Sequence, residues 1–99
     1  MRRVVLKKKT TGGQILIHID NYTTKDQEIT IYDISQDSAE DATVPPTFVS
    51  EMDGEYTKLW KFTLAAGDTF EVTYSGEGGG LIQMQGVAEN LKVEVDLDV

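Results

Sequence analysis

Apolar and polar positions alternate through most of the chain, and the most regular stretch is 58–74. Within it Trp60, Phe62 and Leu64 alternate with polar residues, and a second alternating arm ends at Tyr74 after a Gly-Asp turn. A period of two residues is typical of half-buried antiparallel strands. The pattern therefore predicts two strands joined by a tight corner, with the bulkiest apolar surface of the chain on one face of a single hairpin.

Shorter alternating runs bounded by turn residues predict the other strands. They cover residues 3–10, 14–20, 28–34, 47–50, 81–85 and 91–97. The segment 35–43 has no apolar periodicity and is interpreted as a loop. Because Pro45 and Pro46 forbid regular ladder pairing, 47–50 can only be a short edge strand.

Seven or eight short strands without a convincing helix predict an all-β fold. The spacing favours an antiparallel, immunoglobulin-like β-sandwich of about seven strands, with a small closed barrel as the alternative. Consecutive hairpins would leave the first and last strands at the sheet edges. A length of 99 residues is enough for one modest core, so residues 1–99 are expected to form a single domain.

Composition narrows the setting of this domain. The chain has no cysteine, which excludes a disulfide framework and a thiolate metal site. Its basic start is followed by only three apolar residues, far short of a signal peptide, and nothing approaches a membrane span. We expect a cytoplasmic protein, or a domain of a larger one, that makes no membrane contact.

The charge is unevenly distributed along this acidic chain, whose net charge is −8. Five of its nine basic residues lie in the first nine positions: Arg2, Arg3, Lys7, Lys8 and Lys9. This basic arm could make weak contacts with nucleic acid phosphates, although the acidic body repels nucleic acid at long range. The alternative is that the lysines decorate an edge strand and prevent aggregation.

No set of residues demands a chemical reaction, so we expect no enzymatic activity, no cofactor and no metal. His18 is the only histidine, and with Asp20 it makes a poor ligand set compared with the three or four ligands of real zinc sites. Acidic residues in 37–41 and 53–55 could form an inter-loop calcium site, but their spacing matches no EF-hand. Surface histidine and solvated loops are the simpler interpretations.

Two aromatic positions have different predicted roles. Trp60 is in phase with Phe62 and Leu64, which places it at the centre of the core rather than on a carbohydrate-binding platform. Tyr32 and Ile34 lie on the strand face opposite Ile29 and therefore predict an exposed apolar patch. Such a patch usually marks a partner surface.

Two family resemblances enter through these strands. Residues 64–70, Leu-Ala-Ala-Gly-Asp-Thr-Phe, resemble the Leu-x-Pro-Gly-x-x-Tyr corner of fibronectin type III sandwiches, with Ala66 for the proline and Phe70 for the tyrosine. Only the packing of that corner can carry over, because Phe70 has no hydroxyl. The order of segments 4–9, 15–21, 28–32 and 60–67, followed by Tyr74, resembles the immunoglobulin-like domain at the C-terminus of the B subunit of archaeal topoisomerase VI.

The second resemblance implies a non-catalytic accessory domain that presents surfaces to a neighbouring domain or protein partner of a type IIB topoisomerase-like assembly. One alternative is a free-standing adhesion or carbohydrate-binding sandwich. Another is a small structural or viral subunit that self-assembles through its edge strands. The sequence leaves the oligomeric state and the identity of the partner open.

Overall fold

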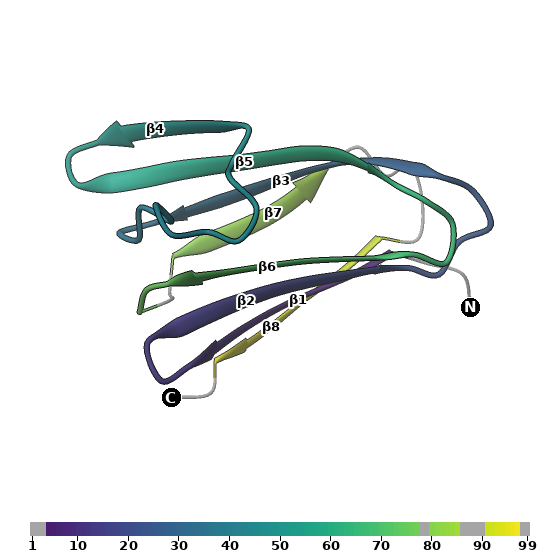
Figure 1. The fold of residues 1–99 in the computed structure, drawn as a ribbon, viewed down its shortest axis with the longest axis horizontal. Helices are drawn as coiled ribbons and strands as arrows, with labels where there is room; N and C mark the ends of the chain where they lie inside the picture. Colours follow the sequence, from purple (N-terminus) through teal and green to yellow (C-terminus); the bar gives the residue numbers. More distant parts are fainter. Residues whose placement is uncertain (1–3, 78–79, 86–90, 98–99) are drawn as a thin grey trace.

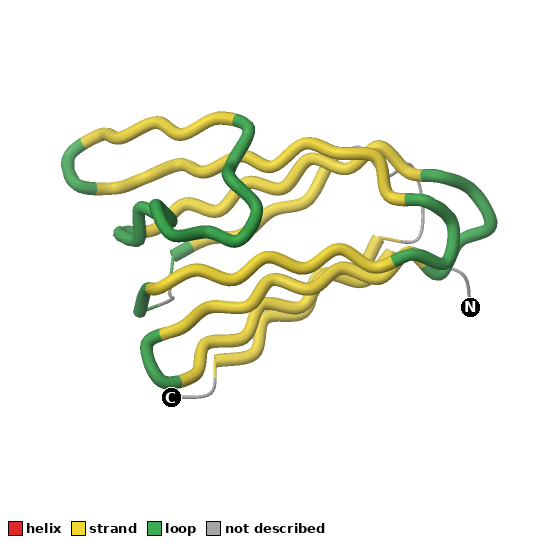
Figure 2. Tube along the Cα trace, in the orientation of Figure 1, coloured by secondary structure: helices red, strands yellow, loops and turns green. Residues whose placement is uncertain are grey.

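The computed structural model describes residues 4–77, 80–85 and 91–97, which form eight strands and no helix. The strands make two four-stranded sheets that pack face to face (Figure 1, Figure 2). Their bounds are β1 Val4–Thr11, β2 Gln14–Asn21, β3 Gln27–Ser35, β4 Phe48–Met52, β5 Glu55–Leu64, β6 Thr69–Ser75, β7 Leu81–Gln85 and β8 Leu91–Leu97. The predicted all-β sandwich is confirmed, and every predicted strand is present with bounds close to those expected.

The strand order corrects one expectation about the sheet edges. The first sheet has the order β6-β2-β1-β8 and the second β4-β5-β3-β7. β1 is therefore an interior strand, because β8 pairs with it in parallel while β2 pairs with it antiparallel. Lysines on β1 cannot protect a sheet edge, whereas β4 and β8 do lie at edges, as predicted.

Two of the hairpins close through two-residue loops in which both residues have positive φ. Gly12 and Gly13 join β1 to β2, with φ of 58° and 80°, and Asp53 and Gly54 join β4 to β5, with φ of 53° and 79°. Loops of this kind match the right-handed twist of paired strands and require residues that tolerate positive φ. Local turn chemistry therefore determines the register of both hairpins.

The central stretch is not a hairpin, which corrects the prediction for 58–74. β5 belongs to the second sheet and β6 to the first, so the corner between them carries the chain across the sandwich (Figure 1). The predicted phase of both arms is right, but their apolar faces meet across the core. The Trp60 and Tyr74 rings stack at 6.1 Å between centroids, and those of Phe62 and Phe70 at 4.0 Å.

Asn21 holds this corner in place. Its side-chain amide donates to the carbonyls of Leu64 at 2.9 Å and Ala65 at 3.2 Å, and its backbone carbonyl accepts from the N–H of Gly67 at 2.8 Å. Asn21 is 1% exposed. These bonds satisfy backbone groups that the chain reversal would otherwise leave unpaired. The corner packing expected from the fibronectin-like pattern is thus accompanied by an asparagine clamp.

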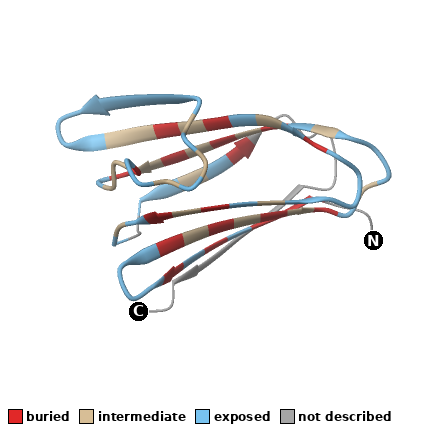
Figure 3. Ribbon diagram, in the orientation of Figure 1, coloured by how far each residue is buried: buried red, intermediate tan, exposed pale blue. Residues whose placement is uncertain are grey.

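The core lies between the two sheets, where inward positions of six strands meet (Figure 3). Trp60 is 1% exposed and its indole N–H donates to the carbonyl of Val44 at 2.8 Å, which confirms its predicted place in the core. Val44 belongs to the loop 36–47, which runs from β3 to β4. The same loop contacts β6, since the N–H of Thr43 donates to the carbonyl of Thr73 at 3.0 Å.

Candidate interaction surface and buried polar network

Apolar side chains gather on the solvent face of the second sheet. In the strand register Leu59 of β5 stands between Phe48 of β4 and Tyr32 of β3, while Ile34 of β3 stands beside Leu81 of β7. Paired residues in a sheet project to the same side. We call these five residues the outer patch.

The outer patch is open to solvent at its borders and closer packed at its centre. Phe48 is 58% exposed and Leu81 50%, whereas Tyr32, Ile34 and Leu59 are half-buried. The structure therefore places Tyr32 and Ile34 on the face predicted for them and adds three apolar neighbours. Binding of a partner there stays a prediction. The neighbours lie on other strands, so only the tertiary pairing could reveal them.

The residues of the predicted basic arm do not share one surface. Lys7 and Lys9 are exposed on the outer face of the first sheet. Lys8 points between the sheets and is 2% exposed, so its assignment to a phosphate-contacting arm is wrong. Arg2 and Arg3 lie outside the described residues. Phosphate contact by Lys7 and Lys9 stays a prediction.

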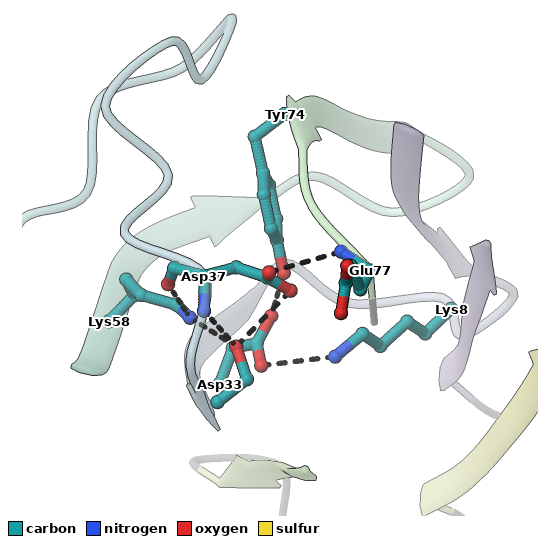
Figure 4. A network of polar contacts seen from close by, with 7 residues as sticks. Lys8, Asp33, Asp37, Lys58, Tyr74 and Glu77 are labelled. Carbon is teal, nitrogen blue, oxygen red and sulfur yellow. Dashed lines mark hydrogen bonds and ion pairs between the residues drawn. The ribbon is translucent and has the colours of Figure 1, made fainter. Parts of the chain in front are cut away.

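Lys8 instead belongs to a polar network inside the sandwich (Figure 4). Its ammonium lies 3.1 Å from a carboxylate oxygen of Asp33, which is fully buried. The other carboxylate oxygen accepts a hydrogen bond from the hydroxyl of Tyr74. Burial raises the pKa of Tyr74, and the neighbouring charge and hydrogen bond of Asp33 raise it further. Tyr74 therefore acts as a neutral donor to the carboxylate.

Lys58 adds a second buried cation beside this carboxylate. Its ammonium donates to the hydroxyl of Ser35 at 2.7 Å and to the backbone carbonyl of Asp37. It also lies 5.7 Å from the centroid of the Tyr74 ring, within cation–π range. Burial lowers the pKa of Lys58, while Asp33 and Asp37 act in the opposite direction. Two lysines facing two aspartates balance the charge of the network.

A sequence signal for this network exists in the phase of three charged residues. Lys8 continues the inward phase of Leu6, Asp33 that of Ile31, and Lys58 that of Trp60. In each strand a charged residue thus occupies an inward position at the same end of the sandwich. Charged residues are almost never fully buried unless paired, so three in-phase charges should indicate a buried ionic cluster. The sequence reasoning above missed this signal.

His18 lies on the outer face of the first sheet between two carboxylates. Its Nδ1 is 2.9 Å from Glu71 of β6, and its Nε2 is 2.9 Å from Asp20. The hydrogen bond with Glu71 raises the pKa of His18, burial partly offsets this, and Asp20 raises it further. Both ring nitrogens are engaged by carboxylates, which favours the imidazolium rather than a metal-binding imidazole.

The pKa of His18 is expected to lie above its ordinary value of 6.5. A raised folded-state pKa makes the stabilisation by His18 complete below pH 6.5 and progressively lost as the pH rises through the folded-state value. NMR titration of the single imidazole measures this directly. Glu71→Gln should move the pKa down toward 6.5, and a wild-type pKa at or below 6.5 would contradict the assignment.

The acidic loop residues serve the fold rather than one another. The carboxylate of Asp41 accepts from the N–H and hydroxyl of Ser75, and that of Asp37 accepts from the N–H of Glu77 at 3.1 Å. Within the described part of the chain, no three His, Asp or Glu side chains are arranged to hold a metal ion. The calcium interpretation therefore has no geometric support among these residues.

Comparison with known families assigns the chain. The family model for the C-terminal domain of the B subunit of type 2 DNA topoisomerase 6 matches residues 1–94. The chain belongs to this family. The resemblance noted in the order of the strands is thereby confirmed, and the topoisomerase VI context implies a neighbouring domain or subunit.

Other comparisons bear on the fold only. Similar solved structures include the GH20 exo-β-N-acetylglucosaminidase of Vibrio harveyi, as an inactive mutant with a TM-score of 0.57 and in complex with N-acetylglucosamine with 0.56. Both are 12% identical to this chain, cover 98% of it, and are matched over 18% of their own length. The search of curated proteins found no significant match. Among the described residues there is no helix that could span a membrane.

Proposed function

We propose that this chain is a non-catalytic, immunoglobulin-like interaction module of a cytoplasmic, archaeal topoisomerase VI-type assembly. Its outer patch packs against a neighbouring domain or subunit of that assembly. The observation that carries the proposal is the cluster of five apolar side chains on a sheet face that the sandwich core does not use.

The composition of this face supports a protein partner. An apolar centre surrounded by polar residues is the usual anatomy of a protein interface, with aromatic residues enriched in it. Tyr32 and Phe48 supply the aromatic rings, while Thr30, Lys61 and Gln83 supply a polar border. The inner face of the same sheet already covers the core, so the outer patch is not required for folding of the sandwich.

The carbohydrate-binding alternative loses its main support. Such a platform would require an exposed Trp60 with neighbouring tyrosines in one plane, but Trp60 is buried and its ring stacks with that of Tyr74 inside the core. Nucleic-acid contact has weaker support than a protein partner, because Lys8 is committed to the buried network and leaves Lys7 and Lys9 as the exposed lysines of β1.

Truncation of the outer patch should weaken assembly. We expect Tyr32→Ala combined with Phe48→Ala to reduce affinity for a topoisomerase VI assembly lacking this domain by at least about tenfold, since buried interface aromatics often contribute more than 1 kcal/mol each. Isothermal titration calorimetry with the purified chain measures the change. Leu16→Ala, on the outer face of the other sheet, is the matched control and should leave affinity unchanged.

Two outcomes would contradict the proposal. Equal binding by the double variant and the wild type would exclude the outer patch as the docking surface. Turnover of ATP or cleavage of DNA by the chain alone would exclude a non-catalytic role. Circular dichroism of each variant establishes that it is folded before binding is compared.

A further inference from the structure

We propose that the open edge of β4 binds an extended segment of a partner polypeptide that alternates apolar and basic residues, and adds it to the second sheet as a fifth strand. This deepens the proposed function, on which it rests, by naming the chemistry of the partner. The argument comes from the backbone of β4, from its two side-chain faces and from the charge around its end.

β4 presents free backbone groups along the rim of its sheet (Figure 1). The two-residue loop after Met52 makes residues 48, 50 and 52 the hydrogen-bonded partners of β5, so Val49 and Glu51 direct their N–H and C=O groups away from it. Among the described residues, no backbone hydrogen bond reaches that open side. An unpaired row of this kind is a template for another strand.

The edge strand β6 shows how this chain closes an open edge. The carbonyl of Thr73 accepts from the N–H of Thr43 at 3.0 Å, and the N–H of Ser75 donates to the carboxylate of Asp41 at 3.0 Å. Loop 36–47 thus occupies the free side of β6. The same loop continues directly into β4 without covering it. One edge is capped and the other is left available.

The two faces of β4 specify what an added strand would carry. All five residues of β4 are exposed (Figure 3), and they include Phe48, Val49 at 44% and Met52 at 75%. Phe48 and Met52 project to the side of the outer patch, so the incoming strand needs apolar residues on that side. Exposed apolar residues on a rim strand are otherwise an aggregation hazard that natural edges avoid.

The opposite face of β4 is acidic. A hydrogen bond with Glu51 and the charge of Glu40 both raise the pKa of Tyr56, which places these two carboxylates beside one ring. Asp53 and Glu55 follow at the turn, and the nearest lysine on β5, Lys58, is buried with its ammonium directed to Ser35. Basic side chains on this face of the added strand would complement the charge. A second copy of this chain, with a net charge of −8, would not.

Strand addition of this kind combines main-chain hydrogen bonds, which supply affinity, with alternating side-chain contacts, which supply specificity. A suitable probe is a short capped peptide that alternates valine with arginine. A peptide of the same composition with its valines and arginines in two blocks has the same charge but lacks the two-residue period. A third peptide carries glutamate in place of arginine. Amide chemical shifts and hydrogen exchange locate the binding site.

We expect the alternating basic peptide to bind at least about tenfold more tightly than the blocked one and to protect the amides of Val49 and Glu51 from exchange. Glu51→Lys should reverse the preference toward the glutamate peptide. Glu28→Lys, with the same change in charge on β3, should leave the preference unchanged. Val49→Pro removes an outward N–H and should abolish binding while preserving the bonds between β4 and β5.

Equal binding of the alternating and blocked peptides, or equal effects of Glu51→Lys and Glu28→Lys, would overturn the proposal. So would chemical shift changes confined to other strands, or dimerisation through β4 in sedimentation experiments. If Val49→Pro fails to fold, Glu51→Lys decides the question. None of these results depends on the outer-patch variants, so failure of strand addition and failure of the proposed function can be told apart.

Discussion

Trp60→Ala is expected to lower the free energy of unfolding by about 3–5 kcal/mol, because a fully buried aromatic ring is replaced by a cavity. The ring stacks on Tyr74 and its N–H is bonded to the carbonyl of Val44, so both contacts are lost together. This is a large share of the roughly 5–15 kcal/mol that stabilises a typical domain. Urea unfolding followed by far-ultraviolet circular dichroism measures the difference.

A matched control separates the ring from its hydrogen bond. Trp60→Phe keeps an aromatic ring in the core but cannot donate to Val44, and should cost less than Trp60→Ala. The fluorescence of wild-type Trp60 should be blue-shifted and resist quenching by iodide, since the chain has a single tryptophan that is 1% exposed. A cost below about 1 kcal/mol for Trp60→Ala would be inconsistent with this burial.

Asp33→Ala is expected to destabilise the sandwich by a similar amount, about 3–5 kcal/mol, because it leaves the ammonium of Lys8 buried without its carboxylate. The hydroxyl of Tyr74 loses its acceptor in the same substitution. Asp33→Asn should cost less, since the amide oxygen can still accept from one of the two donors. Denaturant unfolding at neutral pH measures each variant.

Two further variants test whether burial of the charge causes this effect. Glu28→Ala removes an exposed carboxylate from the same strand and should change stability little. Replacing both partners, Lys8→Met with Asp33→Leu, should recover most of the stability lost in Asp33→Ala, because an apolar pair leaves no buried charge. Equal costs for Asp33→Ala and Glu28→Ala would contradict the buried network.

The two main corrections share a physical origin. Strand formation depends on side-chain alternation within a few residues, which explains why the predicted bounds of β2, β7 and β8 lie within one residue of those observed. Whether β5 and β6 pair in one sheet or face each other in two depends on the corner between them. That corner is held by Asn21, a residue more than 40 positions away.

The sequence alone determined the strands, the phase of their apolar faces, the edge position of β4 and the core position of Trp60, since these follow from local alternation and backbone sterics. Only the tertiary structure decided that Lys8 points inward. A lysine on a strand is compatible with solvent or with a buried partner, and its partner Asp33 lies 25 residues away. The outer patch likewise exists only because register aligns residues from four strands, a long-range property that no short segment specifies.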